Sequence, residues 1–177
     1  MPMRPTDRLI HPSRGNPDQA IAWARQAGAR RLDQVEAFIR EVYRLCALVG
    51  LDAAILVAHS AVETGDPVRG CGWRSPAWSE RLNPSGLGIT DGGDLGYRFT
   101  SGVEAARAHV VHHYLYAKGL VPPDSPLEPY VTLDPRYNAV PAAWRGAVRT
   151  IADLTGKWWT NPRGAEAVAA RGNALFP

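Results

Sequence analysis

One acidic residue closes the most apolar stretch of the chain, where a solvated side chain is not expected. This residue, Glu63, stands near the end of Ala58-His-Ser-Ala-Val-Glu-Thr-Gly65. Partial burial and the negative end of a helix dipole would both favour the neutral form of its carboxyl. A carboxylic acid that keeps its proton can protonate a departing sugar oxygen in a glycosidase. Glu63 is therefore a candidate general acid, although periodicity equally allows an outward-facing glutamate in the last helical turn.

The helices that must position this acid are predicted from apolar spacing and capping residues. Asp52 caps a helix from Ala53 to about Thr64, and its residues are apolar almost all round. That pattern predicts the central buried helix of the fold. Further helices are predicted from Asn16-Pro17 to Gly28, from Val35 to Gly50, from Ser101 to Lys118, from Pro141 to Leu154 and from Pro162 to about Ala170.

A single β element is predicted beside these helices. Leu87-Gly-Ile-Thr90 and Gly96-Tyr-Arg-Phe99 flank the turn sequence Asp91-Gly-Gly-Asp94, which is typical of a small β-hairpin. The predicted fold class is therefore mainly α, formally α+β, with one small hairpin. Residues 1–15 are expected to form an N-terminal tail before one domain over residues 16–177.

Composition excludes several classes of protein. The 177 residues are 45% hydrophobic and 21% charged, which is ordinary for a globular domain and unlike a disordered or collagen-like chain. The longest apolar stretch, Leu51 to Val62, is too short for a bilayer span, so no membrane insertion is expected. The net charge is +3, and the arginines are spread along the chain rather than clustered. A nucleic-acid partner is therefore not expected.

The first residues and the cysteines bear on where the protein acts. No apolar core of a classical signal peptide follows Met1, so we expect a phage-encoded protein or export by another route. Cys46 lies on a helical pattern and Cys71 in a glycine-rich loop. The two can pair only if the fold brings them together, and a buried free thiol at Cys46 is the simpler expectation.

The segments after Glu63 are similar to those of a known family. Gly72-Trp-Arg-Ser75 and Arg81-Leu-Asn-Pro-Ser-Gly-Leu-Gly-Ile-Thr90 follow the acid, and Tyr130-Val-Thr-Leu-Asp-Pro-Arg-Tyr137 lies further on. With Phe99-Thr-Ser-Gly-Val-Glu-Ala-Ala106, they resemble the glucosaminidase domains of bacterial and phage cell-wall hydrolases, glycoside hydrolase family 73. The resemblance covers most of residues 17–177 and implies a lysozyme-like fold. Asp153-Leu-Thr-Gly-Lys-Trp158 is most similar to the phage-associated members.

The resemblance implies roles for individual residues. Glu63 would be the catalytic acid, and Tyr130 would lie near it in the cleft and stabilise the charged intermediate state. Because Leu133 is an extra residue in the motif around Tyr130, Tyr137 is the alternative for that position. His59 stands one turn before Glu63, where these domains often have glutamine, and would border the substrate and tune the acid.

The remaining groove residues would come from the loops after Glu63. Trp73 and Trp78 would stack on sugar rings, or else pack in the core or anchor a loop. Glycines in the groove would let the backbone approach the sugar chain closely. The other expected binding residues are Asn83, Ser85, Gly86, Gly88, Tyr97 and Tyr137.

A second catalytic group is harder to identify. Asp91 in the hairpin turn is the first candidate for positioning the attacking water, with Asp94 and Glu80 as alternatives. The substrate's own acetamido group can also replace a protein base. No metal and no organic cofactor is implied. His109 and His113 have the i, i+4 spacing of metal ligands, but no glutamate follows the first as a zinc-protease motif requires.

These observations predict an enzyme that hydrolyses the glycan strands of peptidoglycan, as an endo-β-N-acetylglucosaminidase. Two alternatives use the same scaffold: cleavage at the muramic-acid bond by an N-acetylmuramidase, and cleavage there by a lytic transglycosylase. Another is a non-catalytic wall-binding or phage structural module. We expect a monomer that acts at the bacterial cell wall.

Overall fold

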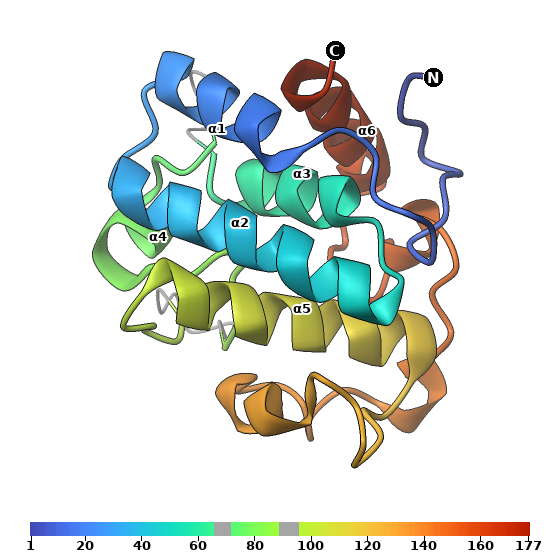
Figure 1. The fold of residues 1–177 in the computed structure, drawn as a ribbon. Helices are drawn as coiled ribbons and strands as arrows, with labels where there is room; N and C mark the ends of the chain where they lie inside the picture. Colours follow the sequence, from blue (N-terminus) through green and yellow to red (C-terminus); the bar gives the residue numbers. More distant parts are fainter. Residues whose placement is uncertain (66–71, 89–95) are drawn as a thin grey trace.

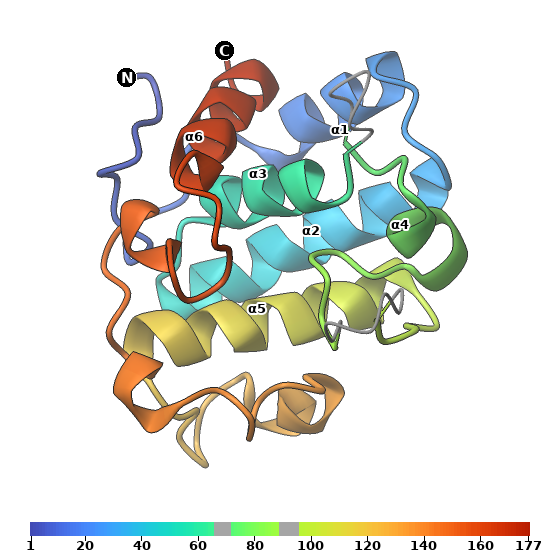
Figure 2. The same ribbon diagram turned by 180° about the vertical axis from the view of Figure 1, so that it is seen from behind.

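The predicted central helix is the core of the protein. The computed structural model describes residues 1–65, 72–88 and 96–177. Helix α3 (Ala53–Glu63) lies between α2 (Leu32–Val49) and α5 (Gly102–Lys118) on one side and α6 (Gly164–Leu175) on the other, as Figures 1 and 2 show from opposite sides. Every residue from Ala53 to Ala61 is buried. A mainly helical architecture is therefore confirmed.

The caps expected from the sequence set the helix ends. The side chains of Asn16, Asp52 and Ser101 each accept a backbone N–H at the start of α1 (Pro17–Gln26), α3 and α5. These bonds satisfy donors that have no partner within a helix. After α2, Gly50 takes a left-handed φ of 67°, which a side chain would strain. Local chemistry thus fixes both ends of the connection that leads into α3.

The predicted helix from Pro141 to Leu154 is wrong. The structure has two short 3-10 turns there, η2 (Ala142–Trp144) and η3 (Ala152–Leu154). Between them, the N–H groups of Gly146 and Val148 donate to the carbonyl oxygens of Leu115 and Tyr116, at 2.9 and 3.0 Å. The Tyr116 carbonyl, in the last turn of α5, has no helical donor, whereas the Leu115 carbonyl also accepts the N–H of Gly119. The segment is extended because it satisfies the end of α5.

Other elements differ from expectation in extent. The last helix, α6, begins and ends later than predicted. Two short helices were not predicted: α4 (Pro76–Arg81) and the 3-10 helix η1 (Glu128–Leu133). Much of the predicted hairpin, including Asp91 and Asp94, lies outside the described residues. Its described flanks, 87–88 and 96–99, contain no strand, although the Tyr97 N–H donates to the Leu87 carbonyl oxygen at 2.8 Å.

The first fifteen residues pack on the helical body. Leu9 is fully buried, and its N–H donates to the carbonyl oxygen of Arg149 at 3.0 Å. Its own carbonyl accepts the N–H of Asp52, the residue that caps α3, at 2.8 Å. The segment predicted as a tail therefore helps to hold the start of the central helix.

Two further expectations concern the cysteines and the membrane. Cys46 is a buried free thiol, and burial raises its pKa well above the usual value. Cys71 lies outside the described residues. Among the helices of the described ranges, none has both the length and the apolar character that crossing a bilayer requires.

Candidate active site

Glu63 ends α3 at the border between the core and solvent. Its side chain is 28% exposed, and its Oε1 lies 3.6 Å from Nε2 of His59, one turn earlier. The next residue, Thr64, is buried and fastens the helix end, because its hydroxyl donates to the Ser60 carbonyl and accepts the N–H of Trp73. Glu63 is therefore a surface residue whose side chain is partly covered and lies against the buried His59.

The proton on each ring nitrogen of His59 follows from its neighbours. Nδ1 of His113 lies 2.9 Å from the carbonyl oxygen of His109, and a carbonyl only accepts, so this nitrogen carries a proton. Burial lowers the pKa of His113 well below its usual value and keeps the ring neutral. The Nε2 of His113 therefore carries a lone pair and can only accept a hydrogen bond. The Nδ1 of His59, 2.9 Å away, must donate to it.

This chain of bonds leaves one atom of His59 without a partner. In the neutral ring its Nε2 carries a lone pair and no proton. This nitrogen is fully buried and makes no hydrogen bond within the described residues. The atom faces Glu63. A proton on either group would make the contact attractive, since a protonated carboxyl would donate to the ring and a protonated ring would donate to the carboxylate. Catalytic hydrogen bonds are often this long before substrate is bound.

His109 connects this pair to the loop after α4. Its Nε2 donates to the Leu56 carbonyl oxygen at 3.0 Å, so its Nδ1 accepts the Ser85 hydroxyl at 2.9 Å. Burial lowers the pKa of His109, and the ring is neutral like that of His113. The rings of His59 and His109 lie 6.0 Å apart. The structure therefore brings Ser85 to the same buried cluster that supports Glu63.

Asn83 folds that loop. Its side-chain oxygen accepts the N–H groups of Ser85 and Leu87, and its amide donates to the carbonyl oxygens of Leu87 and Tyr97. Gly86 and Gly88 have left-handed φ values of 69° and 76°, which favour glycine. The fully buried Asn83 thus shapes the loop from beneath, and the loop's upper surface is backbone.

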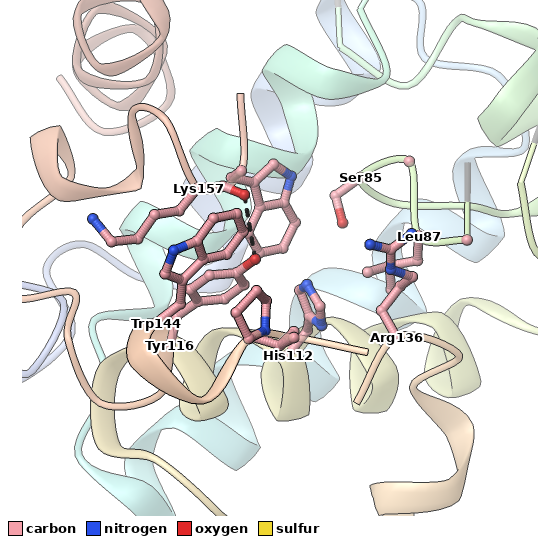
Figure 3. A pocket seen from close by; sticks show the side chains of 12 residues that line it. Ser85, Leu87, His112, Tyr116, Arg136, Trp144 and Lys157 are labelled. Atoms are coloured by element: carbon pink, nitrogen blue, oxygen red, sulfur yellow. Dashed lines mark hydrogen bonds between the residues drawn. The ribbon is translucent and has the colours of Figure 1, made fainter. Parts of the chain in front are cut away.

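The loop forms one wall of a pocket of about 150 Å³. Figure 3 shows His112 between the loop and Arg136 on one side and the rings of Tyr116 and Trp144 on the other. Trp158 completes the wall, and its ring lies 4.5 Å from His59 and 4.7 Å from His112. The pocket and the Glu63 region therefore share this tryptophan.

The two tryptophans expected to stack on sugars are in the core. Trp73 and Trp78 are both fully buried. The indole N–H of Trp73 donates to the Ser60 hydroxyl at 3.1 Å, and that of Trp78 donates to the Arg30 carbonyl at 3.0 Å. Neither ring offers a free face, so the packing alternative describes them. Tyr97 is 46% exposed beside Gly88 and offers an aromatic surface next to the loop.

The structure does not bring Tyr130 to this cluster. The guanidinium of Arg107 lies 4.4 Å above the Tyr130 ring. Arg107 and His109 are about 200° apart around α5, so they face opposite sides of the helix. The orange segment that holds η1 lies across α5 from α3 in both views (Figures 1 and 2). Tyr137 is nearly buried, and its hydroxyl accepts the N–H of Val121 at 2.8 Å.

The remaining candidates are placed as follows. Asp91 and Asp94 lie outside the described residues, and Glu80 is exposed on α4. His109 and His113 use both of their ring nitrogens in hydrogen bonds within the protein, which leaves no lone pair directed outward for a metal. Over residues 1–65, 72–88 and 96–177, no three histidine, cysteine or acidic side chains form a group that could hold a metal ion.

Sequence reasoning missed Trp158, Trp159 and the pairing of His112 with Asp134. His112 Nδ1 donates to Asp134 Oδ2 at 2.8 Å, and the Asp134 side chain is fully buried. Three histidines on one helix were a signal, but spacing within that helix cannot identify partners from distant segments. The Glu63–His59 and His112–Asp134 pairs are both contacts between a histidine and a carboxyl group, and Trp158 lies against the histidine of each. Comparison of the chain with protein-family models, curated proteins and solved structures gave no match.

Proposed function

We propose that this protein hydrolyses the glycan strands of peptidoglycan at the N-acetylglucosaminyl bond, with Glu63 as the general acid on a lysozyme-like helical scaffold. The observation that carries the proposal is the contact between Glu63 and the unpartnered Nε2 of His59. A buried lone pair without a partner is costly, and such atoms are uncommon in folded proteins. Here it faces a partly exposed carboxyl, which suits proton transfer to a bound substrate.

The reaction needs one proton for the leaving group and one water. Glu63 donates its proton to the glycosidic oxygen while the bond between that oxygen and the anomeric carbon breaks. The oxygen of water then bonds to the anomeric carbon. The proton lost by that water goes to Asp91, or returns to Glu63 where the acetamido group of the substrate has assisted departure. His59 supports either course by remaining beside the carboxyl as its proton leaves and returns.

The loop after α4 suits a polysaccharide. Gly86 and Gly88 give it a backbone path that favours glycine, and the Ser85 hydroxyl is held by His109. The exposed ring of Tyr97 beside this loop supplies the kind of flat apolar surface on which sugar rings stack. These features replace the buried tryptophans as the proposed sugar contacts. With this substrate the protein would act at the bacterial cell wall.

Digestion of purified peptidoglycan tests the proposal. We expect the wild-type protein to release fragments with new N-acetylglucosamine reducing ends, which mass spectrometry identifies. Glu63→Gln should lower this release by at least about a hundredfold, since general acid catalysis contributes that much or more. Glu128→Gln is the matched control, because Glu128 is exposed on η1, across α5 from Glu63. Full activity of Glu63→Gln would refute the proposal.

The same products separate the alternatives. Muramic-acid reducing ends would indicate an N-acetylmuramidase, and anhydromuramic ends a lytic transglycosylase. Binding of the strands by the wild-type protein without any new ends would indicate a wall-binding or phage structural module. Thermal unfolding of each variant shows whether a loss of activity reflects a loss of folding.

A further inference from the structure

The pocket beside the loop contains polar groups that the proposed reaction does not use. The fully buried side chain of Asp134 holds two of the residues that line it. One carboxyl oxygen accepts the His112 ring N–H at 2.8 Å, and the other accepts the backbone N–H of Arg136 at 2.9 Å. A single buried carboxylate therefore fixes the positions of two residues that line the pocket. Such preorganisation is typical of binding sites.

Arg136 supplies a positive charge to this pocket. Among the residues that the structure describes, no carboxylate pairs with its guanidinium and no acceptor binds it. Lys157 also lines the pocket, but its ammonium donates to the Asp153 carbonyl at 2.9 Å and its side chain extends away from Arg136 in Figure 3. Arg136 is therefore the cation available to a ligand here.

The pocket also contains a hydroxyl donor and several aromatic rings. Burial raises the pKa of Tyr116 to about 12, so its hydroxyl keeps a proton, which it donates to the Lys157 carbonyl at 3.4 Å. The Tyr116 and Trp144 rings stack at 6.4 Å and form an apolar wall. Opposite them, the ring of His112 stands with its Nδ1 bound to Asp134. An acidic group beside an apolar surface would complement this lining.

The size of the pocket limits what can enter. The pocket volume of about 150 Å³ is below the several hundred cubic ångströms of sites that hold whole drug-sized ligands. The pocket therefore admits a substituent of a sugar, or one sugar ring in part, and not an oligosaccharide. Trp158 contacts both His59 and His112, so one aromatic ring separates this pocket from the histidine beside Glu63.

We propose that this pocket binds the carboxylate of an N-acetylmuramyl residue, with Arg136 as the charged partner of its lactyl group. The inference rests on the proposed function, because muramyl residues alternate with N-acetylglucosamine in peptidoglycan. Muramic acid differs from N-acetylglucosamine by this acidic ether, so the pocket would distinguish the two sugars of the strand. The lactyl carboxylate is free only where the stem peptide is absent, and the site therefore favours peptide-free strands.

Binding of monosaccharides to the whole protein tests this inference without bond cleavage. Nuclear magnetic resonance titration would compare N-acetylmuramic acid, its methyl ester, N-acetylglucosamine and lactate. We expect the acid to bind at least about tenfold more tightly than the ester or N-acetylglucosamine, because a charge-assisted bond is lost in both. Arg136→Gln should remove this preference. Arg25→Gln on α1 makes the same charge change at an exposed position and should retain it.

Four results would overturn the inference. The first three are equal binding of the acid and its ester, unchanged preference in Arg136→Gln, and no detectable binding of the acid at millimolar concentration. Binding of lactate as tight as that of N-acetylmuramic acid would also overturn it, since the site would then recognise the acid without the sugar. None of these results depends on Glu63, whereas loss of strand cleavage would refute the proposed function and leave the binding preference standing.

Discussion

The two sides of α5 handle polar groups in opposite ways. On one side, Glu41 accepts hydrogen bonds from Arg44 and Arg107 at 2.7 and 2.9 Å, and Arg107 also covers the ring of Tyr130. On the other side, His109 and His113 are neutral and buried, and they lead to the unpartnered Nε2 of His59. The first side pairs its charges internally. The second ends in an atom that faces a carboxyl at the surface.

This difference separates residues that hold the fold from those that can act on a substrate. A charge whose partners lie within the protein has little interaction left for a ligand. A buried acceptor with no partner destabilises the fold unless something else uses it. We therefore assign the Glu41 cluster a structural role and the Glu63–His59 pair a chemical one.

After Glu63 itself, the largest effect is expected from changing His59. His59→Gln should lower the rate of strand cleavage by about tenfold or more, because Glu63 loses its neighbouring acceptor. The dependence of the rate on pH should also change shape, which a purely structural role would not produce. His11→Gln, at an exposed histidine, is the control. An unchanged pH profile in His59→Gln would contradict the chemical role assigned to the Glu63–His59 pair.

The neutral histidines should make the protein sensitive to acid. Burial lowers the pKa of His109 and His113 in the folded state, so the unfolded chain binds protons more readily. Their contribution to stability is therefore complete above pH 6.5 and is lost as the pH falls toward the folded pKa. Each histidine should lower the free energy of unfolding by about 1.4 kcal/mol per pH unit below 6.5. Urea denaturation from pH 7.5 to 5 measures this slope, and a flat profile would show that the rings are charged when folded.

Mutation of the Glu41 cluster should change the stability of the protein but not the rate of strand cleavage. Glu41→Gln removes the partner of two arginines and should lower the free energy of unfolding by about 1 kcal/mol without changing cleavage. The Arg44 hydrogen bond lowers the pKa of Glu41 below 4.5. Its contribution is therefore present above pH 4.5 and lost as the pH falls through the folded pKa. Chemical denaturation at pH 7 and pH 3.5 should show a smaller difference between mutant and wild type at the lower pH.

The smallest effect is expected at Tyr130. Tyr130→Leu removes the cation–π contact with Arg107 and should cost about 0.5 kcal/mol of stability. Cleavage should stay within about twofold of wild type, because the residue lies on the structural side of α5. A large loss of cleavage with intact folding would instead support the catalytic role that the sequence resemblance implied.

The sequence predicts well what depends on neighbouring residues. Asp52 and Gly50 mark the ends of helices through local hydrogen bonds and backbone conformation. The position of Glu63 at the end of a buried helix could therefore be predicted from the sequence. The bonds from His59 to His113 and from Ser85 to His109 join segments far apart in the chain, and no spacing rule reveals them. The same is true of the extended segment at Gly146, whose conformation is set by the end of α5.

The tryptophans and Tyr130 show a related limit. A large aromatic residue near a predicted groove is equally suited to the core, and Trp73 and Trp78 are buried because their N–H groups find internal acceptors. Tyr130 lies in a motif that resembles a catalytic one, but the side of α5 that it meets is decided by the path of residues 119–137. Composition and spacing contain no information about that path.

The role of Glu63 as a proton donor is tested most directly by varying the leaving group. Chitobiose linked to 2,4-dinitrophenol needs no proton for departure, whereas chitooligosaccharides and peptidoglycan strands do. We predict that Glu63→Gln cleaves the natural strands at least about a hundredfold more slowly than wild type and the dinitrophenyl substrate at nearly the wild-type rate. Equal losses on both substrates would contradict the assignment of Glu63 as the general acid.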